Sequence, residues 1–122
     1  MDQDRTAAGP IVTGFGAGGF RIGETHHRAV LMTATEATDW TPPPLDALTV
    51  ADLKWLIGAR PEFVLLGTGP TLRHPAPALA RALDAAGIGL EVMDSRAAAR
   101  AWGVLRSEGR PIAAAFYPLD KP

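Results

Sequence analysis

The sequence contains no cysteine, and this absence removes a whole group of chemistries. Without a thiol there is no disulfide, no thiolate metal site, no iron–sulfur ligation and no cysteine nucleophile. A chain that does without disulfides suits a reducing compartment, so we expect a cytoplasmic protein. Packing alone must then hold the fold together, and 122 residues are enough for one hydrophobic core.

Basic clusters, leader segments and long apolar runs are also missing. The formal net charge is −1, and Lys54 is the only lysine before the C-terminal tail, so the sequence predicts no nucleic-acid binding. The first ten residues carry two acids and no apolar core, which argues against a signal peptide and against a mitochondrial presequence. No apolar run approaches the roughly 20 residues needed to cross a bilayer, so we expect no membrane span.

The composition is that of an ordinary globular domain, with 47% apolar and 20% charged residues. We expect a disordered N-terminus at residues 1–9, one α/β domain at residues 10–118 and a short tail at residues 119–122. The elements described below predict an α/β fold with about three helices and an N-terminal β-hairpin.

The N-terminal third has the alternation and turn residues of short antiparallel strands. Residues 11–13, 20–22 and 25–33 are the expected strands, with a tight turn at Gly18 and Gly19. Residues 34–45 are expected to form a connection, because three consecutive prolines at 42–44 fit neither a helix nor a central strand. Trp40 should pack onto the body of the domain and hold this connection in place.

A helix is predicted after Thr49, which has the pattern of an N-cap with Asp52 three residues later. Leu48 and Leu53 have the spacing of a hydrophobic staple across that helix start. Gly58 and Pro61 should end it. Its expected apolar stripe consists of Val50, Leu53, Leu56 and Ile57.

Residues 63–95 predict one βαβ unit. An apolar strand at 63–66 is followed by a Gly-Thr-Gly turn, a helix and a second strand that ends near Asp94. Pro75 and Pro77 are expected in the first turn of the helix, and Gly87 is its expected left-handed cap with Leu83 against Ile88. The predicted inner face of the helix is Leu79, Ala82, Leu83 and Ala86.

A last helix and strand complete the predicted chain order. Ser95 is expected to cap a helix that continues to Glu108, with Gly109 ending it and Ala98, Ala101, Trp102 and Leu105 on one face. The alternative is an end at Gly103, which costs about 1 kcal/mol inside a helix. Residues 111–117 should form the final strand.

The turn after the 63–66 strand is the candidate ligand site. Glycines at 67 and 69 let backbone N–H groups approach an anion, and Arg73 offers five donors to a carboxylate or phosphate. The candidate ligand-binding residues are Gly67, Thr68, Gly69, Arg73, Asp94 and Ser95. A plain tight βα turn is the competing and favoured interpretation, in which Arg73 pairs with a nearby acid such as Asp94 and ties the loop to the sheet. Leu72 stands where a dinucleotide fold needs a third glycine, so dinucleotide binding is disfavoured.

Other reactive residues do not assemble into a known catalytic or metal pattern. His26 and His27 point to opposite faces of one strand, and His74 lies far along the chain, so no metal site and no cofactor are expected. No serine sits in a nucleophile elbow, and we therefore expect no catalytic residue. Trp55 and Trp102 are candidate interface residues, with the core as their alternative place.

Three short motifs together resemble a known family. They are Gly67-Thr68-Gly69, the strand end Glu91-Val92-Met93-Asp94-Ser95 and Glu108-Gly109-Arg110. The chain resembles, over residues 11–116, the uncharacterised-domain family that includes mitochondrial complex I assembly factor 3 and adipogenesis-associated proteins. Where that family reads Ala-Cys-Arg-Thr-Tyr-Asn, this sequence has Ala98-Ala99-Arg100-Ala101-Trp102-Gly103. The resemblance implies a three-layer α/β fold, in which helices flank a mixed β-sheet and the N-terminal β-hairpin packs alongside, and it implies no established catalytic residue.

The sequence and the resemblance together favour a small, non-enzymatic accessory or assembly protein that acts through protein–protein contacts. The alternative is a domain, enzymatic or not, that binds a small molecule or anion at the Gly67-Thr68-Gly69 loop. A concave polar pocket at that loop would favour the second hypothesis. An exposed apolar patch that includes Trp55 or Trp102 would favour the first. The partner's identity and self-association both stay open at this stage.

Overall fold

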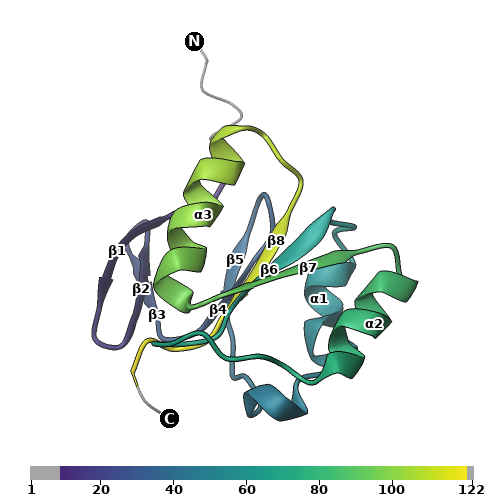
Figure 1. Ribbon diagram of the computed structural model, residues 1–122. Coiled ribbons are helices and arrows are strands. Elements are labelled where there is room, and N and C mark those ends of the chain that lie inside the picture. The colour runs from purple at the N-terminus through teal and green to yellow at the C-terminus, as the bar shows by residue number, and fades with distance from the viewer. Residues whose placement is uncertain (1–8, 121–122) are drawn as a thin grey trace.

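A computed structural model describes residues 9–120, and these form one α/β domain of three layers (Figure 1). The middle layer is a five-stranded mixed sheet with strand order β5-β4-β8-β6-β7. A three-stranded antiparallel sheet, β1-β2-β3, packs on the same side as α3, and α1 and α2 lie on the other side. The strands are β1 (Val12–Gly16), β2 (Gly19–Ile22), β3 (Thr25–His27), β4 (Val30–Met32), β5 (Ala37–Asp39), β6 (Phe63–Gly67), β7 (Gly89–Met93) and β8 (Ala113–Phe116). The α-helices are α1 (Lys54–Ile57), α2 (Pro77–Ala85) and α3 (Ser95–Ser107).

The predicted βαβ unit is confirmed, with β6 and β7 pairing in parallel. From β7 the chain crosses back over β6, and β8 pairs with the other side of β6, again in parallel. Because the two crossovers run in opposite directions along the sheet, right-handed connections place α2 and α3 on opposite faces. Residues 63–66 are therefore covered on both sides, as their uninterrupted apolar run predicted.

Two buried clusters form the core, one on each face of the five-stranded sheet. Val64 and Leu66 pack with the side of α1 and α2, whereas Leu65 packs with Trp102 and Phe20 on the side of α3 and β2. Alternate residues of a strand point to opposite faces, so one strand serves both clusters. Trp40 packs against the first cluster, as expected.

The expected strand at residues 25–33 is wrong in one respect, because it is two strands in two sheets. His27 of β3 pairs with Phe20 of the small sheet, whereas Val30 of β4 pairs with Phe116 of the large one. The chain bends at Arg28 and Ala29 between them. The polar start pairs in the small sheet, and the apolar end enters the buried large sheet.

The expected connection at residues 34–45 also contains a strand that the sequence did not reveal. Ala37–Asp39 forms β5 and pairs antiparallel with β4 at the edge of the large sheet. The segment is short and polar, so it has no hydrophobic alternation. Backbone pairing with β4 stabilises it instead.

The helix predicted after Thr49 is present, but its first half is a 3₁₀ helix at Val50–Leu53 before α1. The capping interaction is confirmed, because the Thr49 backbone N–H donates to Asp52 Oδ2 at 2.9 Å. Gly58 keeps a right-handed conformation with φ −60°, and the positive φ of 54° falls on Arg60. The four expected stripe residues all contact the first core cluster.

The predicted C-terminal cap of the middle helix, α2, is confirmed, whereas the predictions for its first turn and for its inner face are corrected. Gly87 has φ +78°, and the Ile88 N–H donates to the Leu83 carbonyl at 2.9 Å, which is the Schellman bond. Pro77 is the first helical residue, so Pro75 lies before the helix and not in its first turn. Ala82 and Ala86 are exposed, because this short helix contacts the core through Leu79 and Leu83 only.

The last helix takes the longer of the two predicted courses. Gly103 lies inside α3, Glu108 is its C-cap and Gly109 has φ +75°. Most of the expected N-terminal disordered segment lies outside the described residues. Between residues 9 and 120, no helix combines the length and apolar character that a membrane crossing requires.

Candidate functional site

The carboxyl ends of β6, β7 and β8 meet at one edge of the large sheet, because these strands run parallel. The antiparallel pairing of Val30 with Phe116 and with Asp39 brings the start of β4 and the end of β5 to the same edge. Ligands of open α/β sheets bind at this kind of edge. The expected Gly-Thr-Gly turn lies here.

The loop after β6 consists of two parts that we name separately. The inner loop is residues 67–69, which are all buried, and the outer loop is residues 70–74, which are exposed. A Cβ at Gly67 would lie 2.8 Å from Ser95 Oγ and 3.0 Å from Phe116 Cδ1. Gly69 has φ +105°, a backbone conformation that residues other than glycine rarely adopt. Both glycines are therefore required by packing or by backbone geometry.

Ser95 holds the inner loop against the start of α3. Its side chain is 0% exposed, accepts the Gly69 N–H at 2.8 Å and donates to the Tyr117 carbonyl at 2.8 Å. The prediction that Ser95 caps α3 is wrong. Asp94 is the N-cap, and its Oδ1 accepts the Ala97 N–H at 2.9 Å. Because the helix begins at Ser95, the residue before it takes the capping position.

Thr68 uses its polar groups inside the loop as well. Its N–H donates to the Met93 carbonyl at 2.9 Å, and its hydroxyl donates to the Thr71 carbonyl at 2.8 Å. The same hydroxyl accepts the Arg73 N–H at 3.0 Å. The amides of Thr68 and Gly69 are thus already bonded to protein, so the inner loop offers little to an anion.

A pocket of about 430 Å³ lies beside the loop, and we call it the loop pocket. Its walls are the inner and outer loops, residues 41–45 and the tail that follows β8. Residues that bring polar or cyclic groups to it include Arg28, Pro43, Gly69, Arg73, Tyr117 and Asp120. Of the predicted site residues, Thr68, Gly69 and Arg73 line it, whereas Gly67, Asp94 and Ser95 do not.

Two arginines in the loop pocket differ in their partners. Arg28 Nη2 donates to Asp120 Oδ1 at 2.8 Å, and both side chains are about half exposed. Arg73 forms no ion pair with a carboxylate among residues 9–120, and the expected competing pair with Asp94 is not formed. An arginine without a carboxylate partner in a concave surface is available to an anionic ligand.

Tyr117 forms the floor of the loop pocket at its meeting with the proline segment. Its hydroxyl donates to the Pro43 carbonyl at 2.9 Å, and its ring lies edge-on to Trp40 with centroids 5.1 Å apart. Burial raises the pKa of Tyr117 well above its ordinary value, Asp52 adds to the rise and Arg73 opposes it. The phenol is therefore neutral at physiological pH and acts as a donor.

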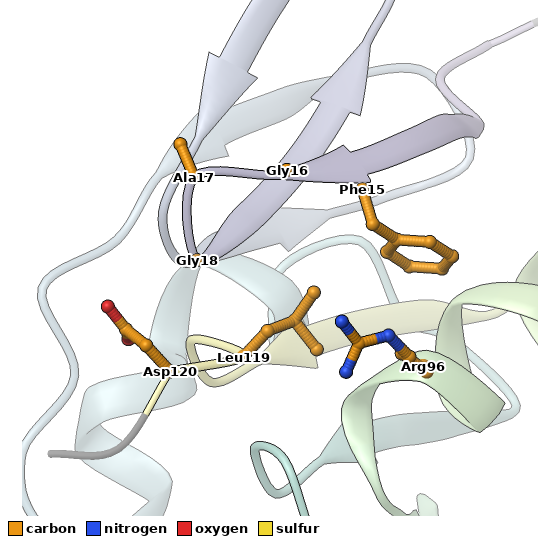
Figure 2. A pocket seen from close by; sticks show the side chains of 7 residues that line it. All are labelled: Phe15, Gly16, Ala17, Gly18, Arg96, Leu119 and Asp120. Carbon is orange, nitrogen blue, oxygen red and sulfur yellow. The ribbon is translucent and has the colours of Figure 1, made fainter.

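A second pocket of about 210 Å³ lies on the other side of the tail, and we call it the turn pocket (Figure 2). It lies between the β1–β2 turn, the start of α3 and the tail. The Arg96 guanidinium carbon is 5.5 Å from the centroid of the Phe15 ring. In Figure 2 this guanidinium points between Phe15 and Leu119, and the Asp120 carboxylate points away from it.

Two histidines and one tryptophan form hydrogen bonds within the fold. His27 Nδ1 lies 2.5 Å from Asp39 Oδ1, His26 Nε2 donates to the Gly16 carbonyl, and no group of three or more potential metal ligands occurs within residues 9–120. Trp102 is fully buried, and its indole N–H donates to the Pro10 carbonyl at 2.8 Å. It is therefore a core residue and not an interface residue, whereas Trp55 is 39% exposed.

Several pocket residues escaped the sequence reasoning. These residues come from three separate segments, and no local spacing joins them: Arg28 precedes β4, Arg96 lies on α3, and Tyr117 and Asp120 lie in the tail. The available signals were weak: Tyr117 is the only tyrosine, and the three consecutive prolines are hard to place elsewhere than at a surface.

Comparison with known proteins agrees with this fold. An uncharacterized protein of Rhodobacter capsulatus is 38% identical over 109 residues, which cover 88% of this chain and 84% of that protein. The crystal structure of a Bordetella parapertussis protein has a TM-score of 0.82 and 32% identity, over 91% of this chain and 97% of the other. The solution structure of a Mth938-like domain from Bordetella pertussis has a TM-score of 0.77 and 26% identity, over 97% and 90% respectively. Residues 12–117 match the family described as a protein of unknown function (DUF498/DUF598), and the chain belongs to that family.

Proposed function

We propose that this protein is a non-enzymatic accessory protein that works by binding, and that the loop pocket is its binding site. The ligand group is an anion, a carboxylate or a phosphate, and Arg73 is the residue that holds it. The single observation that carries the proposal is the Arg73 side chain, which lines a concave pocket and lacks a carboxylate partner among residues 9–120.

The bonding of the other polar groups favours binding over catalysis. The hydroxyls of Ser95, Thr68 and Tyr117 each donate a hydrogen bond to a backbone carbonyl. None of these hydroxyls has a histidine or carboxylate partner among the hydrogen bonds of residues 9–120 that would activate it as a nucleophile. This bonding supports a pocket that holds a ligand rather than one that transforms it.

An accessory role is also supported by the resemblance to the family that includes mitochondrial complex I assembly factor 3. In this proposal the anion that enters the loop pocket belongs to the molecule that the protein accompanies. The mixed lining suits such a ligand, because Pro43, Pro70 and Leu45 offer apolar contact beside the guanidinium.

The test is thermal unfolding of the parent protein and of Arg73→Ala, with and without inorganic phosphate at constant ionic strength. Phosphate should raise the melting temperature of the parent and leave that of Arg73→Ala unchanged, because a ligand that binds only the folded state stabilises it. Arg81→Ala is the matched control, since Arg81 is an exposed arginine on α2 and lines neither pocket.

Equal stabilisation of the parent, Arg73→Ala and Arg81→Ala would remove Arg73 from the site. Contacts that do not involve the pocket would then be the basis of the accessory role. Trp55 would be the first residue to substitute in that case, because it is the tryptophan with an exposed side chain on α1.

A further inference from the structure

We propose that the loop pocket and the turn pocket together form one recognition surface for an extended acidic peptide segment of a protein partner. The segment places one carboxylate at Arg73 and a second at Arg96. This inference rests on the proposed function for the loop pocket, and it adds the turn pocket and the class of ligand.

The two pockets are adjacent because the same piece of chain separates them. Asp120 lines both pockets, Pro118 lines one and Leu119 lines the other. The Leu119 N–H donates to the Gly18 carbonyl at 2.9 Å, which fixes the tail against the β1–β2 turn. A ligand that leaves one pocket therefore has to cross only this tail to reach the other.

The charges that line the two pockets are mainly positive, although the whole chain has a net charge of −1. Arg28, Arg73 and Arg96 face a single acid, Asp120, which pairs with Arg28. Arg96, like Arg73, forms no ion pair with a carboxylate among residues 9–120. Two further acids, Asp46 and Asp52, raise the pKa of Tyr117 but line neither pocket.

The shape of this surface favours a peptide over a small phosphate compound. The two guanidinium groups, which form no ion pair with a carboxylate of residues 9–120, line separate hollows on the two sides of the tail, so a compact anion reaches only one. Phe15 is 41% exposed beside Arg96, and Leu72 is 55% exposed beside Arg73. An extended segment with acidic and apolar side chains would contact both the arginines and these apolar groups.

The Asp120 carboxylate competes with the carboxylates of the peptide in this proposal. It already forms an ion pair with Arg28, and Asp120 lines both pockets. A peptide carboxylate that approaches the tail is repelled by it. Asp120→Asn should therefore strengthen binding of an acidic peptide, although it removes one exposed ion pair of the folded protein.

The experiment measures fluorescence anisotropy of labelled synthetic peptides with the full chain. One peptide series carries two glutamates separated by spacers of increasing length, and a reference peptide carries one glutamate. The best two-glutamate peptide should bind the parent about fivefold more tightly than the reference, as expected for one additional exposed ion pair. Arg96→Ala and Arg73→Ala should each remove this advantage, and Arg81→Ala should keep it.

The failure of this inference is distinguishable from the failure of the proposed function. If Arg73→Ala abolishes both phosphate stabilisation and peptide binding while Arg96→Ala changes neither, the loop pocket binds alone and the joined surface is wrong. An oligonucleotide that binds as tightly as the best peptide, and through the same arginines, would also overturn the peptide assignment. If Arg73→Ala affects neither phosphate nor peptide, both proposals fail.

Discussion

The inner and the outer halves of the loop after β6 differ in burial and in bonding. All three residues of the inner loop are buried. The Thr68 amide donates to the Met93 carbonyl, and the Gly69 amide donates to Ser95 Oγ. In the outer loop, residues 70–74 are exposed, and the charged residue Arg73 lines the loop pocket. One loop therefore combines a rigid anchor with an accessible binding surface.

This difference corrects a common inference from glycine spacing. Two glycines after a buried strand suggest a cradle of N–H groups for an anion. Here Gly67 is present because Ser95 and Phe116 leave no room for a Cβ, and Gly69 because of its positive φ. The predictions below test whether stability resides in the inner loop and binding in the outer loop.

The largest effect on stability should come from Gly67→Ala. The new Cβ would lie within 3.0 Å of both Ser95 and Phe116, so we expect a loss of about 2 to 3 kcal/mol from overpacking. Urea denaturation measures this loss. Gly103→Ala is the control, because nothing lies within 4 Å of a Cβ there and alanine favours the helix. A Gly67→Ala protein as stable as the parent would contradict the rigid anchor.

Ser95→Ala should have the second largest effect. The substitution removes the acceptor of the Gly69 N–H and the donor to the Tyr117 carbonyl, and leaves both backbone groups buried. We expect a loss of about 2 kcal/mol in the free energy of unfolding, measured by urea denaturation. Ser107→Ala at the exposed end of α3 should be close to neutral, and an equal loss in both variants would show that Ser95 has no special role.

Tyr117→Phe should cost about 1 kcal/mol at neutral pH, because the Pro43 carbonyl loses its donor. The folded state raises the pKa of Tyr117 above the ordinary 10.0, so its stabilising contribution is complete below that pH and is lost as the pH rises beyond it. The difference between parent and variant should therefore shrink in alkaline solution. Thermal unfolding from neutral pH to above pH 10 measures it, and a constant difference would contradict the account.

Arg73→Ala and Leu72→Ala should have the smallest effects on stability. Both side chains are exposed, and Arg73 has no carboxylate partner among residues 9–120. We expect changes within about 0.5 kcal/mol of the parent. A larger loss in Arg73→Ala would show that the guanidinium stabilises the fold, which would weaken its assignment to a ligand.

The elements with strong local signals could be predicted from the sequence. The βαβ unit, the Gly87 cap and the length of α3 follow from apolar periodicity and from glycines at helix ends. The short strand β5 and the break between β3 and β4 could not be predicted, because pairing partners far along the chain decide them. Asp94 takes the capping role that was expected of Ser95, since a cap shifted by one residue looks the same in sequence.

The candidate site was predictable only where it is local. Arg73 was identified because it follows the Gly-Thr-Gly turn, and it does line the loop pocket. Other charged or polar residues line the pockets only because of the sheet order and the course of the tail; they include Arg28, Arg96, Tyr117 and Asp120. Such a surface is a product of topology, so no motif in the sequence announces it.

The most direct test of the central claim is a phosphate titration of the labelled protein followed by amide chemical shifts in NMR spectra. The amides of Leu72 and His74 should shift with phosphate, and those of Thr68, Gly69 and Arg73 should move little because they are bonded inside the fold. The shifts should disappear in Arg73→Ala and persist in Arg81→Ala. Large shifts at Thr68 and Gly69 that survive in Arg73→Ala would contradict the account and return the binding site to the glycine loop.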